Sequence, residues 1–219
     1  MQPSQRASIG LAKRERTRSS LIAAAYRVFA HKEADAVTID EIIAEAAVAR
    51  GTFYNYFQTR EEVLTAVAAA LSDEMNHSIW AQSTEIEDPA ARMAMAIRQF
   101  LHQAMRDSNW GWVIVRCGLV AAPLSETITM GVTTDLEAGI RMGRFQVTNQ
   151  QAAIDLILGT GLMAMRTILG GHLETDYPEQ IAELILKTLG VDKKEAHSIA
   201  FQVLESLTAD RTYCYEHKF

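Results

Sequence analysis

The sequence predicts an all-α protein, and three observations lead to this prediction. Apolar residues recur at intervals of three and four positions along most of the 219 residues, which is the spacing of one face of an α-helix. Residues that cap helices stand where several of these segments begin. No segment keeps the alternation of apolar and polar residues that a half-buried β-strand requires.

The N-terminal residues are expected to form an arm followed by one helix. Residues 1–12 have no periodic apolar pattern, so we predict a flexible basic arm there. The segment that follows predicts a helix with one apolar face, which consists of Leu21, Ala25, Val28 and Phe29.

Residues 38–57 predict two short helices separated by a tight turn. Thr38 and Glu41 have the spacing of a capping box, in which each side chain satisfies a free backbone amide at the start of a helix. The helical pattern slips phase at residues 46–49, and the second helix follows at once. Two short helices joined in this way are typical of a unit that reads DNA.

Helical patterns continue through the remainder of the chain. Thr59 and Glu62 form another capping box, which predicts a long helix as far as about Trp80. Further helices are expected over residues 88–105, 112–120, 124–142, 148–169, 181–189 and 192–207. The caps predicted for three of them are Asp88 before Pro89, Thr148 with Gln151, and Asp192 with Glu195.

The second short helix combines a cation, hydroxyls and an amide with few acids. Arg can hold guanine and Asn can hold adenine in the major groove, while hydroxyls bind phosphate oxygens. Phe53 and Phe57 are interpreted as core aromatic residues. We therefore expect the DNA contacts to come from Arg50, Thr52, Tyr54, Asn55 and Tyr56.

The net charge of −6 is unevenly distributed along the chain. Residues 1–60 contain nine Lys and Arg against six Asp and Glu, so the N-terminal part is positive and the remainder is strongly acidic. A positive end can approach phosphates while the acidic remainder is held away from them.

Residues 14–71 closely resemble the DNA-binding domain of the tetracycline-repressor (TetR) family of one-component regulators. Two residues depart from the usual pattern of that family. Ala47 stands where the turn commonly has Gly, and Ala49 stands where the second helix commonly starts with Ser, which removes an N-cap hydrogen bond of about 1 kcal/mol. The resemblance rests on Phe29, on Val37–Ile39, on Ile42, Ala44, Ala46 and Val48, on Gly51–Phe57 and on Arg60–Leu64.

The resemblance also implies roles for individual residues. It places Tyr54 and Arg60 on phosphates and Thr38 near the DNA backbone, and Gly51 is expected to permit close approach. Asp40 lies where some relatives place a base-reading cation. We interpret it as an acid that favours the helix dipole in the first turn, the alternative being a contact with cytosine.

The fold implied is a three-helix helix-turn-helix domain joined by a long helix to a helical domain for ligand binding and dimerisation. The expected boundaries are 13–60 for the DNA-binding domain, 61–84 for the connecting helix, and 85–219 for the effector-binding and dimerisation domain.

The C-terminal domain contains seven of the nine Met residues, together with several aromatic residues. Flexible thioethers suit a pocket for varied apolar ligands, although Met at helical spacing also serves as ordinary core. In the family, the helices corresponding to residues 89–169 surround an effector pocket. The candidate effector contacts are Met93, Phe100, Met105, Trp110, Trp112, Arg116, Met142 and Met165.

Two C-terminal helices carry apolar arcs wider than one buried stripe requires, which predicts a two-fold homodimer. In the family these helices form a four-helix dimer interface, and such a dimer presents two reading helices to a palindromic DNA site. The candidate dimerisation residues are Ile154, Leu158, Gly161, Leu162, Ile181, Leu184 and Ile185.

Other classes of function find little support in the sequence. The six His residues have no metal-binding spacing, and no phosphate-binding loop or nucleophile elbow is present, so we predict no enzyme activity, metal or cofactor. A site formed by His77 and His102 is the alternative. Cys117 and Cys214 lack a CxxC pairing. No unbroken apolar run approaches the roughly 18 residues of a membrane helix and no signal peptide is recognised, so a cytoplasmic protein without a membrane partner is expected.

The sequence thus predicts a dimeric repressor that leaves a palindromic operator in double-stranded DNA when a small apolar or amphipathic effector binds. A regulator without an inducer, or an activator, is the first alternative. A helical small-molecule-binding protein or enzyme with a vestigial DNA-binding unit is the second.

Overall fold

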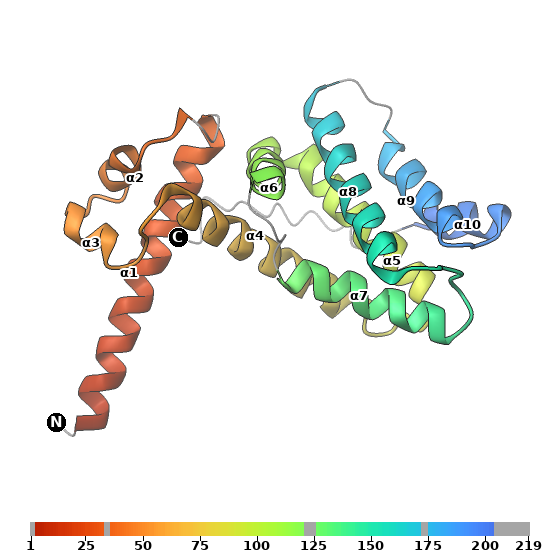
Figure 1. Cartoon of the computed structure of the whole chain (residues 1–219), viewed down its shortest axis with the longest axis horizontal. Helices are drawn as coiled ribbons and strands as arrows, with labels where there is room; N and C mark the ends of the chain where they lie inside the picture. The colour runs from red at the N-terminus through yellow and green to blue at the C-terminus, as the bar shows by residue number, and fades with distance from the viewer. Residues whose placement is uncertain (1–2, 33–35, 121–125, 172–174, 204–219) are drawn as a thin grey trace. The chain divides into compact units, whose positions relative to one another are not determined.

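The computed structural model describes residues 3–32, 36–120, 126–171 and 175–203, which form ten α-helices and no strand (Figure 1). The predicted all-α class is confirmed. The chain divides into two compact units, and the boundary between them along the chain falls within α4, between Ala68 and Ala69.

Unit 1 contains three helices and the beginning of a fourth. They are α1 (Pro3–His31), α2 (Ile39–Glu45), α3 (Arg50–Tyr54) and the first part of α4 (Arg60–Ser83). The helix α1 begins at Pro3, so residues 3–12 are helical where the sequence predicted an arm. Helix-favouring Ala, Leu and Lys residues near position 12 let the helix continue beyond the part that packs on the core.

The core of unit 1 draws on all four of its helices. Its members are completely or almost completely inaccessible to solvent: Leu21, Phe29, Ile42, Phe53, Val63 and Val67. Phe53 and Phe57 are both buried, as predicted. Burial of one face from each helix therefore fixes the short helices α2 and α3 in place.

The predicted capping box at the start of α2 is confirmed. Thr38 Oγ1 accepts a hydrogen bond from the Glu41 amide at 3.3 Å, and Glu41 Oε2 accepts one from the Thr38 amide at 3.0 Å. A bond from Lys32 and the bonds from Thr38 lower the pKa of Glu41 to about 2, so its carboxylate is ionised at neutral pH. At the next capping box Thr59 accepts from the Glu62 amide, but the Glu62 carboxylate accepts from the Gln58 amide instead of from Thr59.

The turn between α2 and α3 contains a strained residue. Ala47 has a φ of 51°, in the left-handed region where a Cβ atom is unfavourable. Ala49 follows as the N-cap of α3 and makes no side-chain capping bond, as its lack of a side-chain oxygen predicted. Both departures from the family pattern therefore carry a small cost in stability.

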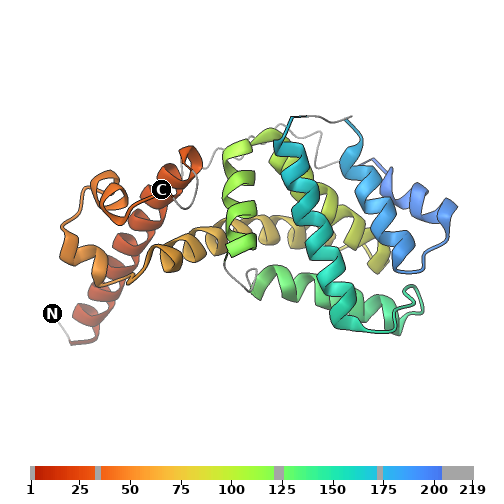
Figure 2. The ribbon, with the colours of Figure 1, turned by 45° about the horizontal axis from the view of Figure 1, so that its top comes forward.

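Unit 2 consists of the second part of α4 and six further helices. These are α5 (Pro89–Arg106), α6 (Ser108–Val120), α7 (Glu126–Arg141), α8 (Gln150–Leu169), α9 (Tyr177–Thr188) and α10 (Lys193–Ala200). The helix α5 is central, because it packs against α6, α7, α8, α9 and α10. Figure 2 shows this arrangement from a second direction.

The helix starts of unit 2 match the predicted caps at two of three positions. Asp88 caps α5 through the Ala90 amide, and Asp192 caps α10 through the Lys194 amide. The cap of α8 is Asn149, not Thr148, because the Asn149 carboxamide accepts from the Ala152 amide at 3.0 Å. The last helix ends at Ala200, whereas the sequence predicted a helix as far as residue 207. Residues 201–203 are not helical, and residues 204–207 lie outside the described residues.

Ion pairs join the helices of unit 2. Arg98 on α5 donates to Glu179 on α9 at 3.0 Å and to the Gln202 carbonyl oxygen at 2.7 Å, and His102 lies 2.8 Å from the same carboxylate. Burial alone would raise the pKa of Glu179, but His102 and Arg98 lower it below its usual value. Arg144 contacts both Asp88 and Glu195, which ties the connection after α7 to two helix starts.

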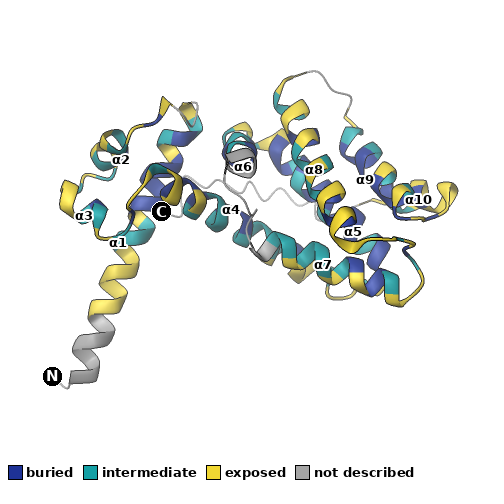
Figure 3. Cartoon of the chain, viewed as in Figure 1, coloured by how far each residue is buried: buried dark blue, intermediate teal, exposed yellow. Residues whose placement is uncertain are grey.

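The helix α8 is only partly covered within the chain (Figure 3). By length and composition Gln150–Leu169 could cross a membrane, with 28% of its most apolar window buried, although one such helix is weak evidence. Asp155 and Arg166 interrupt its apolar sequence. One face of α8 contributes to the core of unit 2, and the remainder of the helix is exposed or half-buried. The buried residues of that face are Ala153, Ile154, Ile157, Ala164 and Met165.

The strained turn gives a test of the local structure. We predict that Ala47→Gly stabilises the protein by about 1 kcal/mol, because Gly adopts a positive φ without a Cβ clash. Urea unfolding followed by circular dichroism measures the change. The control is Ala44→Gly in the exposed part of α2, which should destabilise by about 1 kcal/mol because Gly disfavours a regular helix. Equal losses in both variants would contradict the assigned strain at Ala47.

Candidate DNA-binding surface and effector domain

The helix α3 presents its polar residues outward from the core of unit 1. Phe53 is buried, while Arg50, Gly51 and Asn55 are exposed and Thr52, Tyr54 and Tyr56 are half-buried. A Cβ added to Gly51 meets nothing within 4 Å, so packing does not require Gly at this position. The predicted DNA-contacting residues of α3 and its C-terminal end are thus all at least partly accessible.

Arg50 is held by two side chains on that surface. Its Nη1 lies 2.9 Å from Asp40 Oδ1, and its Cζ lies 5.9 Å from the centre of the Tyr54 ring. A hydrogen bond with Tyr54 and the charge of Asp40 raise the pKa of Arg50. Asp40 is therefore paired with a cation from the next helix, a contact that its position in the first turn of α2 did not reveal.

The remaining predicted phosphate contacts lie on other elements of unit 1. Arg60 begins α4, and its Nε and Nη2 donate to Glu61 Oε1 at 3.1 and 2.9 Å. Thr38 is exposed and engaged in its cap. Arg60 is therefore paired with an adjacent acid, which reduces the net positive charge at the start of α4.

Sequence reasoning missed a hollow between α1 and α3. It has a volume of about 520 Å³ and mixes cationic, hydroxyl and amide groups. The Arg14 guanidinium lies 5.8 Å from the centre of the Tyr56 ring on one side of it. The signal in the sequence was the spacing of Lys13, Arg14 and Thr17 along one helix, and the hollow is lined by Gly10, Lys13, Arg14, Thr17, Thr52, Asn55 and Tyr56.

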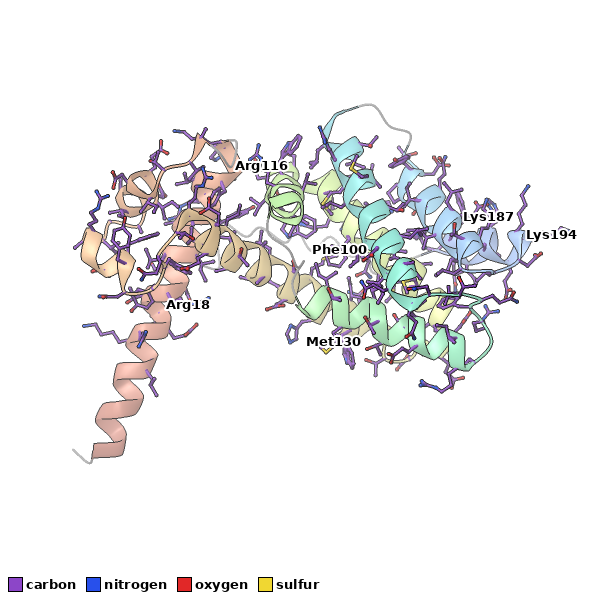
Figure 4. All side chains as sticks on the ribbon, in the orientation of Figure 1. Arg18, Phe100, Arg116, Met130, Lys187 and Lys194 are labelled. Atoms are coloured by element: carbon purple, nitrogen blue, oxygen red, sulfur yellow. The ribbon has the colours of Figure 1, made fainter. Side chains whose placement is uncertain are left out.

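The eight candidate effector residues do not share one environment in unit 2. Met93, Trp110 and Met165 are buried, and Phe100 is half-buried with its ring 5.9 Å from Trp110. Arg116, which is labelled in Figure 4, has its Cζ 5.2 Å from the centre of the Trp112 ring. Met105 and Met142 are 40% and 58% exposed, which places them at the surface of unit 2 instead of in its interior.

The candidate dimerisation residues also divide into two groups. Ile154, Ile181 and Ile185 are buried inside the protomer, so their side chains serve its own core. Leu158, Gly161 and Leu162 are half-buried, and Leu184 is 54% exposed. Two further apolar residues of α8 that the prediction omitted are exposed, namely Leu156 and Met163.

The two histidines of the alternative site have different hydrogen-bond partners. His77 Nδ1 lies 2.7 Å from the Asp73 carbonyl oxygen, whereas His102 contacts Glu179. Among the described residues, no group of three or more His, Cys, Asp or Glu side chains is placed to hold a metal ion.

The capped α2, the turn at Ala47 and the exposed polar face of α3 define a helix-turn-helix DNA-binding protein. Sequence comparison then identifies the family. Residues 21–67 match bacterial regulatory proteins of the tetR family, and residues 88–202 match the tetracyclin repressor-like C-terminal domain. The second match alone spans more than half of the chain, so the protein belongs to the tetR family.

Solved structures resemble nearly the whole chain. RolR in complex with resorcinol is 30% identical, with a TM-score of 0.76, over 89% of this chain and 97% of that one. A TetR-family transcriptional regulator from Pectobacterium atrosepticum is 25% identical, with a TM-score of 0.62, over 83% of this chain and 97% of that one.

A sequence relative matches a shorter part of the chain. An uncharacterized HTH-type transcriptional regulator of Mycobacterium tuberculosis is 27% identical over 88 residues, which span 40% of this chain and 43% of that protein.

The pair of Asp40 and Arg50 predicts how the surface meets DNA. Asp40→Asn should raise the affinity for DNA of any sequence about five-fold, because it removes a negative charge worth about 1 kcal/mol next to the phosphates. Fluorescence polarisation with labelled duplexes measures this change. Glu137→Gln, the same loss of charge at an exposed position of α7, is the control. Weaker binding confined to one DNA sequence would instead assign Asp40 a contact with cytosine.

Proposed function

We propose that the protein is a homodimeric transcriptional repressor that binds a palindromic operator and leaves it when a small molecule occupies unit 2. The observation that carries the proposal is the α3 surface, where Arg50, Thr52 and Asn55 are accessible above a buried Phe53. Membership of the tetR family supports the same function.

The side chains of the α3 surface suit both the major groove and the phosphate backbone of double-stranded DNA. The Arg50 guanidinium and the Asn55 amide can read base edges, whereas Thr52, Tyr54 and Tyr56 have hydroxyls for phosphates. Lys13 and Arg14 add positive charge beside α3 in the hollow of unit 1. Thr38 and Arg60 supply the remaining proposed backbone contacts. Because the proposed partner is double-stranded DNA, the proposed location of the protein is the cytoplasm.

The exposed side of α8 supports the proposed dimer. Leu156 and Met163 are seven residues apart and therefore lie on one face of the helix, and both are exposed. Leu184 on α9 adds apolar surface, and Gly161 has open space where a Cβ would stand. A two-fold contact through α8 and α9 would cover these residues and present two copies of α3 to one operator.

The proposed effector is a small apolar or amphipathic molecule bound in unit 2. RolR, which matches unit 2 as well as unit 1, is solved with resorcinol, and this supports a ligand of that size. The helix α4 contains residues of both units, so a ligand that prefers one position of α4 can shift the population of DNA-binding forms.

DNA binding tests the function directly. DNA from around the gene should contain a site that the protein binds with an affinity that falls steeply with salt, by roughly 0.9 log units per log unit of salt for each phosphate contacted. Arg50→Ala should weaken binding to that site by about 1 to 3 kcal/mol and relax its sequence preference. Lys193→Ala on α10 is the matched charge control and should bind like wild type. Binding that is independent of salt, or equal for the two variants, would contradict the proposal.

The oligomeric state is tested separately. Met163→Lys should shift the protein from dimer to monomer in sedimentation velocity at micromolar concentration, because it places a charge in the proposed apolar contact. Met130→Lys is the control, since Met130 is 62% exposed and lies on α7 (Figure 4). If the Met163→Lys variant remains a dimer, the proposed interface is wrong.

A further inference from the structure

Two polar groups on α4 are buried without partners in unit 2. Asp73 Oδ1 and Asn76 Nδ2 have almost no contact with solvent and form no hydrogen bond. Ile79, three positions beyond Asn76 and on the same face of α4, is buried. The second part of α4 runs beside α7 in both views (Figures 1 and 2). Native proteins leave few buried polar groups unpaired, so a partner for these two atoms is expected.

The two unpaired atoms differ in what they need. A carboxylate oxygen only accepts hydrogen bonds, and an amide nitrogen of Asn only donates them. Residues three positions apart in a helix lie on the same face, with Cβ atoms about 5 to 6 Å apart. A single oxygen between Asp73 and Asn76 can therefore contact both side chains.

A hydroxyl group meets both needs at once. Its O–H donates to Asp73 Oδ1, and its oxygen accepts from Asn76 Nδ2. A ligand carboxylate would oppose the charge of Asp73, and an ammonium group would leave Asn76 without an acceptor. The buried Ile79 beside Asn76 suits an apolar body on the remainder of the ligand.

We propose that Asp73 and Asn76 bind the hydroxyl group of the effector, which is a small hydroxyl-bearing molecule with an apolar body. This inference rests on the proposed function, because it assigns the ligand class of the effector domain. It adds α4 to the candidate effector contacts, which lie on α5, α6 and α8 and just beyond the end of α7.

Phenol and toluene test the inference because they differ by a hydroxyl in place of a methyl group. Calorimetric titration of the full-length protein should show phenol binding about ten-fold or more tightly than toluene. Asp73→Leu and Asn76→Leu should each remove most of this preference. The control Glu137→Leu, at an exposed position of α7, should retain it.

The thermal stability of the ligand-free variants separates a binding role from a structural one. Replacing a buried, unpaired polar group by Leu should raise the Tm by about 2–4 °C. A structural role for either residue predicts a lower Tm instead. The inference fails if the Tm falls, if wild type binds the two probes equally, if it binds neither at millimolar concentration, or if both Leu variants keep the preference for phenol.

DNA binding of the same samples keeps this inference distinct from the proposed function. Operator binding together with an unchanged phenol preference in the Leu variants would leave the repressor in place and overturn the hydroxyl site. Phenol binding that depends on Asp73 and Asn76 without any DNA binding would support the site and overturn the repressor.

Discussion

The burial of Phe53 is the contact on which the DNA-binding surface depends. A helix of five residues has too few internal hydrogen bonds to persist by itself, so α3 exists because tertiary packing holds it. Phe53 is fully buried, and its ring lies 5.5 Å from Tyr54 and 6.0 Å from Phe57. The polar residues of α3 are therefore oriented by one apolar anchor and by the turn at Ala47.

The sequence predicted local features well because they depend on neighbouring residues. The capping box at Thr38 and the buried Phe53 each follow from spacing within one helix. The pair of Asp40 and Arg50 was not predicted, since it joins two helices whose separation is set by the turn. At α8 the sequence predicted Thr148 as the cap and was wrong, because the adjacent Asn149 also has a side-chain oxygen that can accept a capping hydrogen bond and it takes that position.

The predicted dimerisation residues show a different limit. A wide apolar arc indicates that a helix has more than one apolar neighbour, but it does not say which residues face which neighbour. In the structure Ile154 and Ile185 face the protomer's own core, while Leu156 and Leu184 are exposed. The same limit applies to the Met residues of unit 2, because their spacing fits both a core and a pocket.

The proposed effector contact at Asp73 and Asn76 would also change how long the protein survives in a cell. Buried polar groups without hydrogen-bond partners lower the stability of a folded chain. A molecule that pairs with them stabilises the folded chain by mass action, so fewer copies unfold at any moment. Degradation acts on unfolded copies, and the abundance of the protein would then rise with its ligand.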